Sequence, residues 1–146
     1  MFCFIILALL SWAARFKTEI LHPVYWPIFE QVRFKPGWCS KEEPASDAYT
    51  QKIDGTYVIT VDHDVISEGI ICFIFSTLLN EMGHVLHSEY DGWDETDNVQ
   101  HGKRWRELVK KLSNVPDDKI TSIAAEEYGR KHQCYGEKDY HCWVCD

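Results

Sequence analysis

The residues best suited to chemistry lie in the run Asn80-Glu81-Met82-Gly83-His84. Side chains four residues apart on an α-helix share one face, so positions 80 and 84 can converge on one metal ion. The carboxylate of Glu81 would then point at a metal-bound water, whose pKa zinc lowers to about 7 in suitable sites. The pattern therefore predicts metal-assisted hydrolysis, with His84 as a ligand and Glu81 as the general base.

The third ligand must come from outside this helix, since a catalytic zinc is held by three protein ligands and keeps an open position for water. His101 is the candidate, because it begins a new element after a loop and precedes Gly102, which lets the backbone come close. Taken separately, each histidine is more often a structural or surface residue. Their joint order with Glu81 favours a metal site.

Asn80 stands where such a helix carries its first histidine ligand. An amide oxygen is neutral and less basic than an imidazole nitrogen, so the affinity for zinc should fall by orders of magnitude. We therefore predict a Zn²⁺ site that is weak or empty. His87, Glu89, Asp91 and Asp94 are substitute ligands, each less favoured than simple loss of activity.

Two local patterns predict the elements that hold these residues. The pair Asp54-Gly55 lies between runs of β-branched and aromatic residues, which predicts a β-hairpin over residues 49–61. Farther along, an almost wholly apolar segment predicts a buried helix from 67 or 68 to 87 or 88. We expect this helix to cross the domain and to deliver Glu81 and His84 at its far end.

Weaker patterns predict the rest of the domain. Residues 29–34 alternate well enough for a strand, and the prolines within 22–27 should break the helix before it. Residues 41–46 and 89–98 are expected to be loops, the second one acidic. An amphipathic helix is expected over 102–112 and a last helix from 116, with these residues on their apolar faces: Trp105, Leu108, Val109, Leu112, Ile120, Ile123 and Ala124.

The uncharged start of the chain admits two interpretations. Residues 1–13 fit the apolar region of a secretory signal peptide, although no basic residue precedes it. They fit equally well a buried first helix that continues through Trp12, Phe16 and Ile20. The first interpretation implies secretion, and the second an intracellular or nuclear protein. Neither predicts a transmembrane segment, because spanning a bilayer takes about 20 apolar residues.

Composition predicts one ordinary globular domain, and a monomer is expected although the sequence does not fix the oligomeric state. The chain has 146 residues, of which 45% are hydrophobic and 26% charged, enough for a hydrophobic core. Its formal charge of −8 counts against the whole chain gripping nucleic-acid phosphates. A basic strip within 103–111 could do so locally, but a solvated helix face is the better interpretation of it.

The last residues, 133–146, form a cysteine-rich tail that contains Cys134, Cys142 and Cys145. With His132 or His141 as a fourth ligand, they could form part of a zinc ribbon. A disulfide, in an exported protein, or reduced thiols without a partner are the alternatives. The main domain is accordingly expected to span residues 14–132.

These motifs resemble the SprT-like metalloproteases, whose eukaryotic members include the Spartan proteases. That family has an apolar helix ending in Leu-Leu-His-Glu-x-x-His, a variable loop, and His-Gly-x-x-Phe/Trp at the start of the next helix. The matching segments here are Leu78 to His84 and His101 to Trp105, and the loop between them has a typical length. The departure from the family pattern is Asn80, which turns HExxH into NExxH.

The resemblance implies an α+β, zincin-like fold in which helices pack on a small antiparallel β-sheet. It implies that His84 and His101 bind zinc and that Glu81 activates water to hydrolyse a protein or peptide substrate. In cellular members it also implies cleavage of proteins on DNA, a role that the acidic charge here does not support. It further associates the tail with the small zinc ribbon that often follows the protease core.

Three hypotheses for function follow. The first is an SprT-like metallopeptidase whose activity is weakened or lost because of Asn80. The second is a non-catalytic module that presents the same fold to a peptide or protein partner, and Asn80 discriminates between the two because hydrolysis needs the metal. The third and weakest is a small secreted helical protein whose aromatic residues only fill a core.

Overall fold

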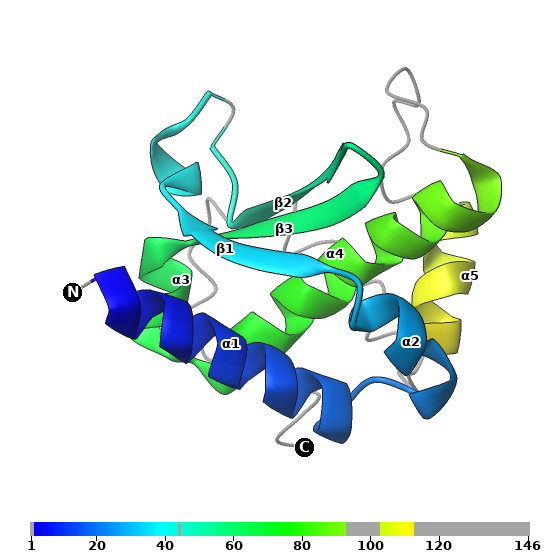
Figure 1. Ribbon diagram of the computed structural model, residues 1–146, viewed down its shortest axis with the longest axis horizontal. Coiled ribbons are helices and arrows are strands. Elements are labelled where there is room, and N and C mark those ends of the chain that lie inside the picture. Colours follow the sequence, from blue (N-terminus) through cyan, green and yellow to red (C-terminus); the bar gives the residue numbers. More distant parts are fainter. Residues whose placement is uncertain (1, 44, 93–102, 113–146) are drawn as a thin grey trace.

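A computed structural model describes residues 2–43, 45–92 and 103–112 of the chain. Within them helices combine with one small sheet, which is an α+β arrangement, as predicted (Figure 1). The elements in chain order are α1 Phe2–Glu19, the 3₁₀ turn η1 Pro23–Tyr25, α2 Trp26–Phe29, β1 Arg33–Gly37, the 3₁₀ turn η2 Cys39–Lys41, β2 Ala48–Ile53, β3 Thr56–Asp62, α3 His63–Glu68, α4 Ile71–Asp91 and α5 Lys103–Leu112.

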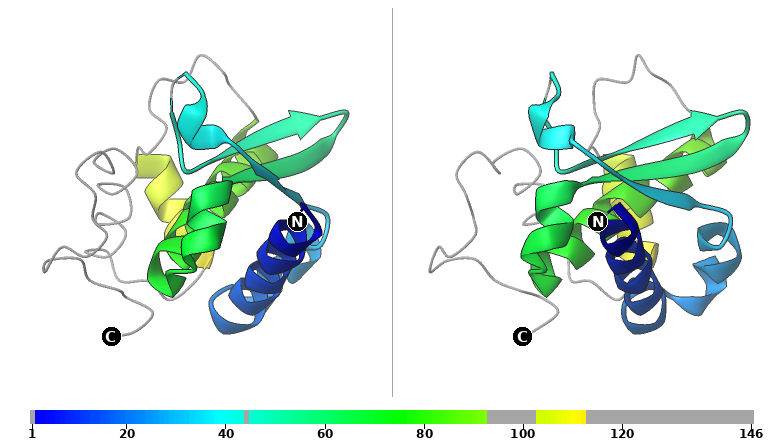
Figure 2. Two further views of the ribbon diagram at one scale, coloured as in Figure 1. Left: turned by 90° about the vertical axis from the view of Figure 1, so that its left-hand side faces the viewer. Right: turned by 60° about the vertical axis from the view of Figure 1, so that its left-hand side comes forward.

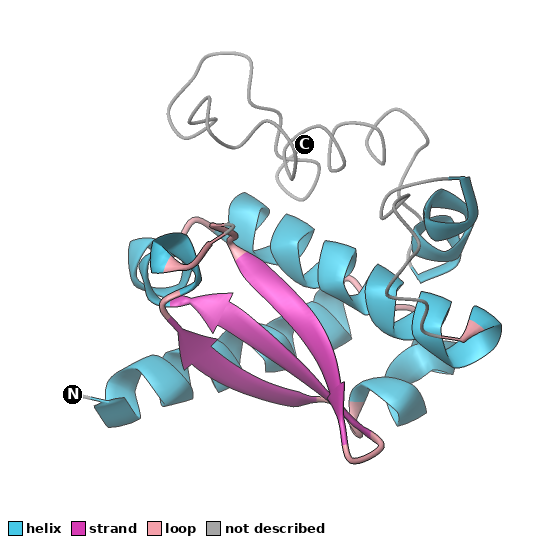
Figure 3. Ribbon diagram, turned by 90° about the horizontal axis from the view of Figure 1, so that it is seen from above, coloured by secondary structure: helices cyan, strands magenta, loops and turns pink. Residues whose placement is uncertain are grey.

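The sheet is mixed, so the prediction of an antiparallel sheet is wrong. Its order is β1-β3-β2, with β2 antiparallel and β1 parallel to the central strand β3 (Figure 3). Residues 38–47 carry the chain from the end of β1 to the start of β2. Ten residues easily cross the width of one intervening strand, roughly 10 Å, so β3 fits between its two neighbours.

The predicted hairpin is confirmed. β2 and β3 pair from Ala48↔Val61 to Ile53↔Thr56. Asp54 (φ 49°) and Gly55 (φ 79°) form the turn between them, both in the positive-φ conformation that this kind of tight turn requires. Tyr57, Ile59 and Val61 alternate along β3 and are buried, so one face of the sheet forms part of the core.

Two helices, α1 and α4, cover this face of the sheet, and α5 packs against α4 (Figures 1 and 2). The buried helix was predicted from residue 67 or 68, but α4 begins at Ile71 and continues to Asp91. A separate helix, α3, precedes it, capped by the Asp62 side chain, which accepts from the Asp64 N–H, and ended by Gly69 in the left-handed conformation (φ 64°).

The strand predicted at residues 29–34 is displaced. Phe29 ends the short helix α2, and β1 covers Arg33–Gly37. Pro23 and Pro27 each lie in the first turn of a short helical segment. Backbone N–H groups in a first turn have no acceptor within the helix, so a proline there costs no hydrogen bond. The prolines therefore break the first helix as expected but start two new turns before the sheet begins.

Helix α1 contributes one side to the core. Leu9, Ala13 and Phe16 are buried at helical spacing, and the ring of Phe16 packs against Phe29 and Phe75. A cut after Ala13 would take Leu9 and Ala13 out of this core. No helix among residues 2–43, 45–92 and 103–112 is long and apolar enough to cross a membrane.

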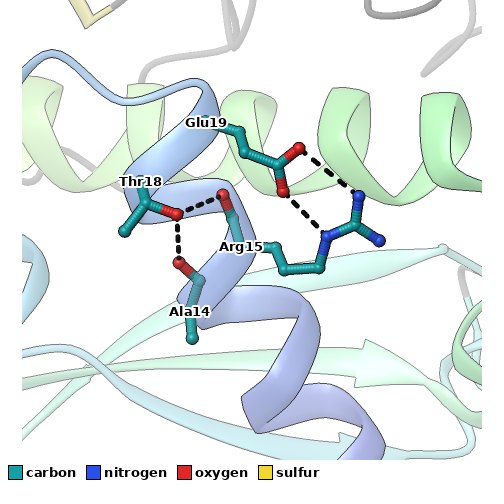
Figure 4. A network of polar contacts seen from close by, with 4 residues as sticks. All are labelled: Ala14, Arg15, Thr18 and Glu19. Carbon is teal, nitrogen blue, oxygen red and sulfur yellow. Dashed lines mark hydrogen bonds and ion pairs between the residues drawn. The ribbon is translucent and has the colours of Figure 1, made fainter.

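The solvent side of α1 is polar near its end. The Arg15 guanidinium bonds the Glu19 carboxylate one turn on, at 2.8 and 3.4 Å, and the Thr18 hydroxyl donates to the carbonyls of Ala14 and Arg15 (Figure 4). The pair raises the pKa of Arg15 and lowers that of Glu19, each mainly through the side-chain hydrogen bond. Exposed pairs of this kind add little stability.

Candidate functional site

Helix α4 holds Glu81 inside the molecule, facing the sheet. The carboxylate is 2% exposed, and the Thr50 hydroxyl of strand β2 donates to its Oε2 across 2.5 Å. The same hydroxyl lies 3.4 Å from the backbone carbonyl oxygen of Glu81. A residue that is distant in sequence therefore fixes the side chain predicted to be the general base.

Asn80 and His84 lie one turn apart on α4, on the side of the helix that meets α5. Asn80 is 1% exposed, and its backbone carbonyl accepts a hydrogen bond from the Trp105 indole N–H at 3.4 Å. His84 is half-buried, with its ring centroid 6.2 Å from that of Trp105. The structure thus brings three predicted site residues, Asn80, Glu81 and His84, to one stretch of helix beside Trp105.

His101, the predicted third ligand, lies outside the described residues. Helix α5 begins at Lys103, two positions later in the sequence, and its Trp105 packs on the segment of α4 that carries Asn80 and His84. Among residues 2–43, 45–92 and 103–112, no three His, Cys, Asp or Glu side chains gather as a metal site would require. The meeting of His84 with His101 stays a prediction.

Gly83 explains how α5 comes so close to α4. A Cβ atom at this position would lie 2.5 Å from Trp105 Nε1 and 2.7 Å from Val109 Cγ2, well inside contact distance. Only glycine leaves room for the α5 side chains over this turn. A glycine in the middle of an apolar helix was the sequence signal for such close packing.

The substitute ligands have other partners where the structure describes them. His87 Nε2 is 3.6 Å from Asp91 Oδ2, and the Arg104 guanidinium donates to both Asp91 oxygens at 2.7 and 3.1 Å. Arg104 lowers the pKa of Asp91, chiefly through these hydrogen bonds. Glu89 accepts a hydrogen bond from the Tyr57 hydroxyl at 2.9 Å. Asp94 lies outside the described residues.

Tyr57 and Thr50 together attach α4 to the sheet at two points. The Tyr57 hydroxyl lies 3.0 Å from Ser88 Oγ, two turns beyond the Thr50–Glu81 bond. Sequence reasoning missed both contacts, because nothing in a strand pattern says which helix residue a hydroxyl will meet. The two hydrogen bonds hold residues 81–88 of α4, which include Glu81 and His84, at a fixed depth under the sheet.

The donor set fits zinc only in part. A half-buried imidazole at His84 beside a buried, oriented carboxylate at Glu81 suits a metal with an open water position. Asn80 suits it poorly, because its amide carries no charge and binds zinc weakly. The predicted cysteine-rich tail, 133–146, lies outside the described residues.

Comparison with known proteins found no matching family model, no matching curated protein and no matching solved structure.

Proposed function

We propose that this protein is an SprT-like, zincin-type metallopeptidase weakened by Asn80, in which Glu81 is the general base for peptide hydrolysis. His84 and His101 would be the zinc ligands. The observation that carries the proposal is the Glu81 carboxylate, buried and oriented by Thr50, on the same turn of α4 as Asn80 and His84. Burial of a carboxylate needs a reason, and general base catalysis supplies one.

The packing of α5 on α4 gives independent support. The resemblance rests on two separate segments, Leu78 to His84 and His101 to Trp105, and a shared site requires that they meet. Trp105 of the second segment contacts Asn80 and Gly83 of the first. This contact is what a shared site requires.

The sheet offers a place for a peptide. Among the described strands, β2 is at the edge of the sheet, with only β3 as a neighbour. An extended peptide can add to such an edge through backbone hydrogen bonds. Because Thr50 of β2 touches Glu81, a peptide on this edge would pass close to the carboxylate.

In this proposal the residues of the site have separate roles. Thr50 holds the Glu81 carboxylate in one orientation, and Glu81 accepts the proton of the attacking water and passes it to the leaving amine. Zinc, when bound, would polarise that water and the scissile carbonyl. His84 would keep its imidazole neutral to serve as a ligand.

The test compares the zinc content and peptidase activity of the purified wild-type chain with those of an Asn80→His variant. We expect substoichiometric zinc in the wild type, about one zinc per chain in the variant, and hydrolysis that follows the zinc. Glu81→Gln in the Asn80→His chain is the matched control, which should keep zinc and lose hydrolysis. Because position 80 is buried, circular dichroism must show that the variant folds.

Two results would count against the proposal. An Asn80→His chain that is folded but binds no zinc would remove the metal site. Equal, stoichiometric zinc in both chains would show instead that Asn80 does no harm, which would contradict the weakened metal site.

The second candidate function is a non-catalytic module that binds a peptide on the same fold. Asn80 itself favours it, since a binding site has no need of a charged metal centre. This candidate predicts that a peptide binds equally well with zinc and with a chelator. Hydrolysis by the wild-type chain would exclude it.

A further inference from the structure

The indole of Trp38 forms a rigid and half-exposed surface at the start of η2. Its side chain is 47% exposed, whereas the next residue, Cys39, is fully buried. One face of the ring stacks on the imidazole of His63, with centroids 4.0 Å apart and planes 6° apart. His63 is itself buried, so the platform under Trp38 is fixed.

The backbone around Trp38 is held as firmly. The backbone N–H and the hydroxyl of Ser40 both donate to Asp62 Oδ1 at 3.0 Å, and the Cys39 thiol lies 3.9 Å from the Thr60 carbonyl oxygen. These contacts join η2 to the end of β3. A side chain that binds on Trp38 would therefore not have to order a loop first.

The second face of the indole already holds a cation. The Lys41 ammonium lies 4.3 Å from the ring centroid, and His63 covers the first face, so Lys41 must lie over the other one. A cation over the face of tryptophan is attracted by the negative charge of the π-system. Lys41 is exposed and its long side chain can swing away.

Acidic groups make this region negative. The pKa of the Cys39 thiol is raised to about 12, first by burial and then by the negative charges of Asp62, Glu42 and Glu81. Thr50, which binds Glu81, pairs with Ile59, and Ile59 lies three residues before Asp62 on β3, so about 10 Å of strand separates the two sites. A basic group near Trp38 would experience the attraction of the Asp62 carboxylate, which binds Ser40, and of Glu42, which directly follows η2.

We propose that Trp38 is a binding subsite for a basic side chain, arginine or lysine, of a peptide held next to Glu81. The Lys41 ammonium occupies the subsite in the free protein and gives way to the incoming group. This inference rests on the proposed function, because it assumes that a peptide lies along this end of the sheet. It adds a preference for basic residues that the metal site alone does not contain.

The test measures the binding of two fluorescently labelled peptides to the full chain by anisotropy, with EDTA present to prevent hydrolysis. The peptides are Ala-Ala-Arg-Ala-Ala and the same sequence with glutamine at its centre. We expect the arginine peptide to bind about tenfold more tightly. Trp38→Leu should abolish the difference and Trp38→Phe should keep part of it, because leucine is apolar but has no π-face.

Two lysine variants complete the design. Lys41→Ala removes the competing cation and should strengthen binding of the arginine peptide. Lys17→Ala is the matched control, since the Lys17 ammonium also lies over an indole, that of Trp26 at 5.0 Å, but on helix α1 and away from β2. It should change nothing.

Equal binding of the two peptides, binding of neither, or selectivity that survives Trp38→Leu would overturn the inference. The outcomes also separate it from the proposed function. Hydrolysis without a preference for arginine leaves the metallopeptidase proposal intact and removes the subsite. Arginine-selective binding by a folded Asn80→His chain that takes up no zinc would support the subsite and remove the metallopeptidase proposal.

Discussion

Glu81 shows how much a single contact decides at the residue scale. Its carboxylate is almost inaccessible to solvent, and burial of a charged group is costly unless hydrogen bonds compensate for it. Thr50 supplies such a bond from strand β2. The position of the candidate base thus depends on a hydroxyl that lies 31 residues away in sequence.

Replacement of Thr50 by valine should therefore destabilise the protein. Valine keeps the shape but removes the donor, and we expect a loss of about 1–3 kcal/mol in the free energy of unfolding in urea. Thr18→Val, at an exposed position on α1, should stay within about 0.5 kcal/mol. If Thr50→Val costs as much in a Glu81→Ala chain as in the wild type, the hydrogen bond is not the cause.

Cys39 gives a second prediction at this scale. Burial is the main reason that its thiol pKa rises from 9.0 to about 12. Because the folded-state pKa is the higher one, the stability due to the protonated thiol is complete below about pH 9 and is lost as the pH rises toward 12. At pH 8 iodoacetamide should leave Cys39 unmodified in the native chain and alkylate it in urea. Mass spectrometry of the peptide that contains Cys39 decides the matter, and modification at equal rates in both states would contradict the buried position.

At the scale of elements, helix α1 packs against the core with one face and exposes the other to solvent. Leu9 is 1% exposed and belongs to the core, whereas its neighbour Leu10 is 47% exposed. We expect Leu9→Ala to cost about 2–5 kcal/mol in the free energy of unfolding, because it leaves a cavity. Leu10→Ala should cost less than about 1 kcal/mol. Similar losses for the two variants, measured by urea denaturation, would show that α1 does not pack as described.

The elements also show which patterns can be predicted from sequence. The Asp54-Gly55 turn and the amphipathic residues of α5 are local signals, and both were predicted correctly. The short helix α3 was missed. Its capping residue Asp62 directly follows the predicted hairpin, and its last residues fall where the long helix was predicted to begin, before Gly69. The parallel pairing of β1 with β3 was missed as well, since strand order depends on contacts between distant residues.

The same distinction holds for the site when the whole molecule is considered. Helical spacing alone predicts that Asn80, Glu81 and His84 lie together, and it predicts the buried face of α5 that contains Trp105. Thr50 and the Trp38–His63 stack could not be predicted, because they arise only when separate elements pack. The helix predicted from residue 116, His101 and the cysteine-rich tail lie outside the described residues, so those predictions are untested.

The central claim is that the imidazoles of His84 and His101 bind one zinc ion beside Glu81. The most direct measurement is the zinc affinity, by competition with a chelator of known affinity, of an Asn80→His chain and of the same chain carrying His84→Ala or His101→Ala. Loss of one ligand of three should weaken binding by at least about 100-fold in each double variant. Unchanged zinc affinity in the His101→Ala chain would contradict the claim.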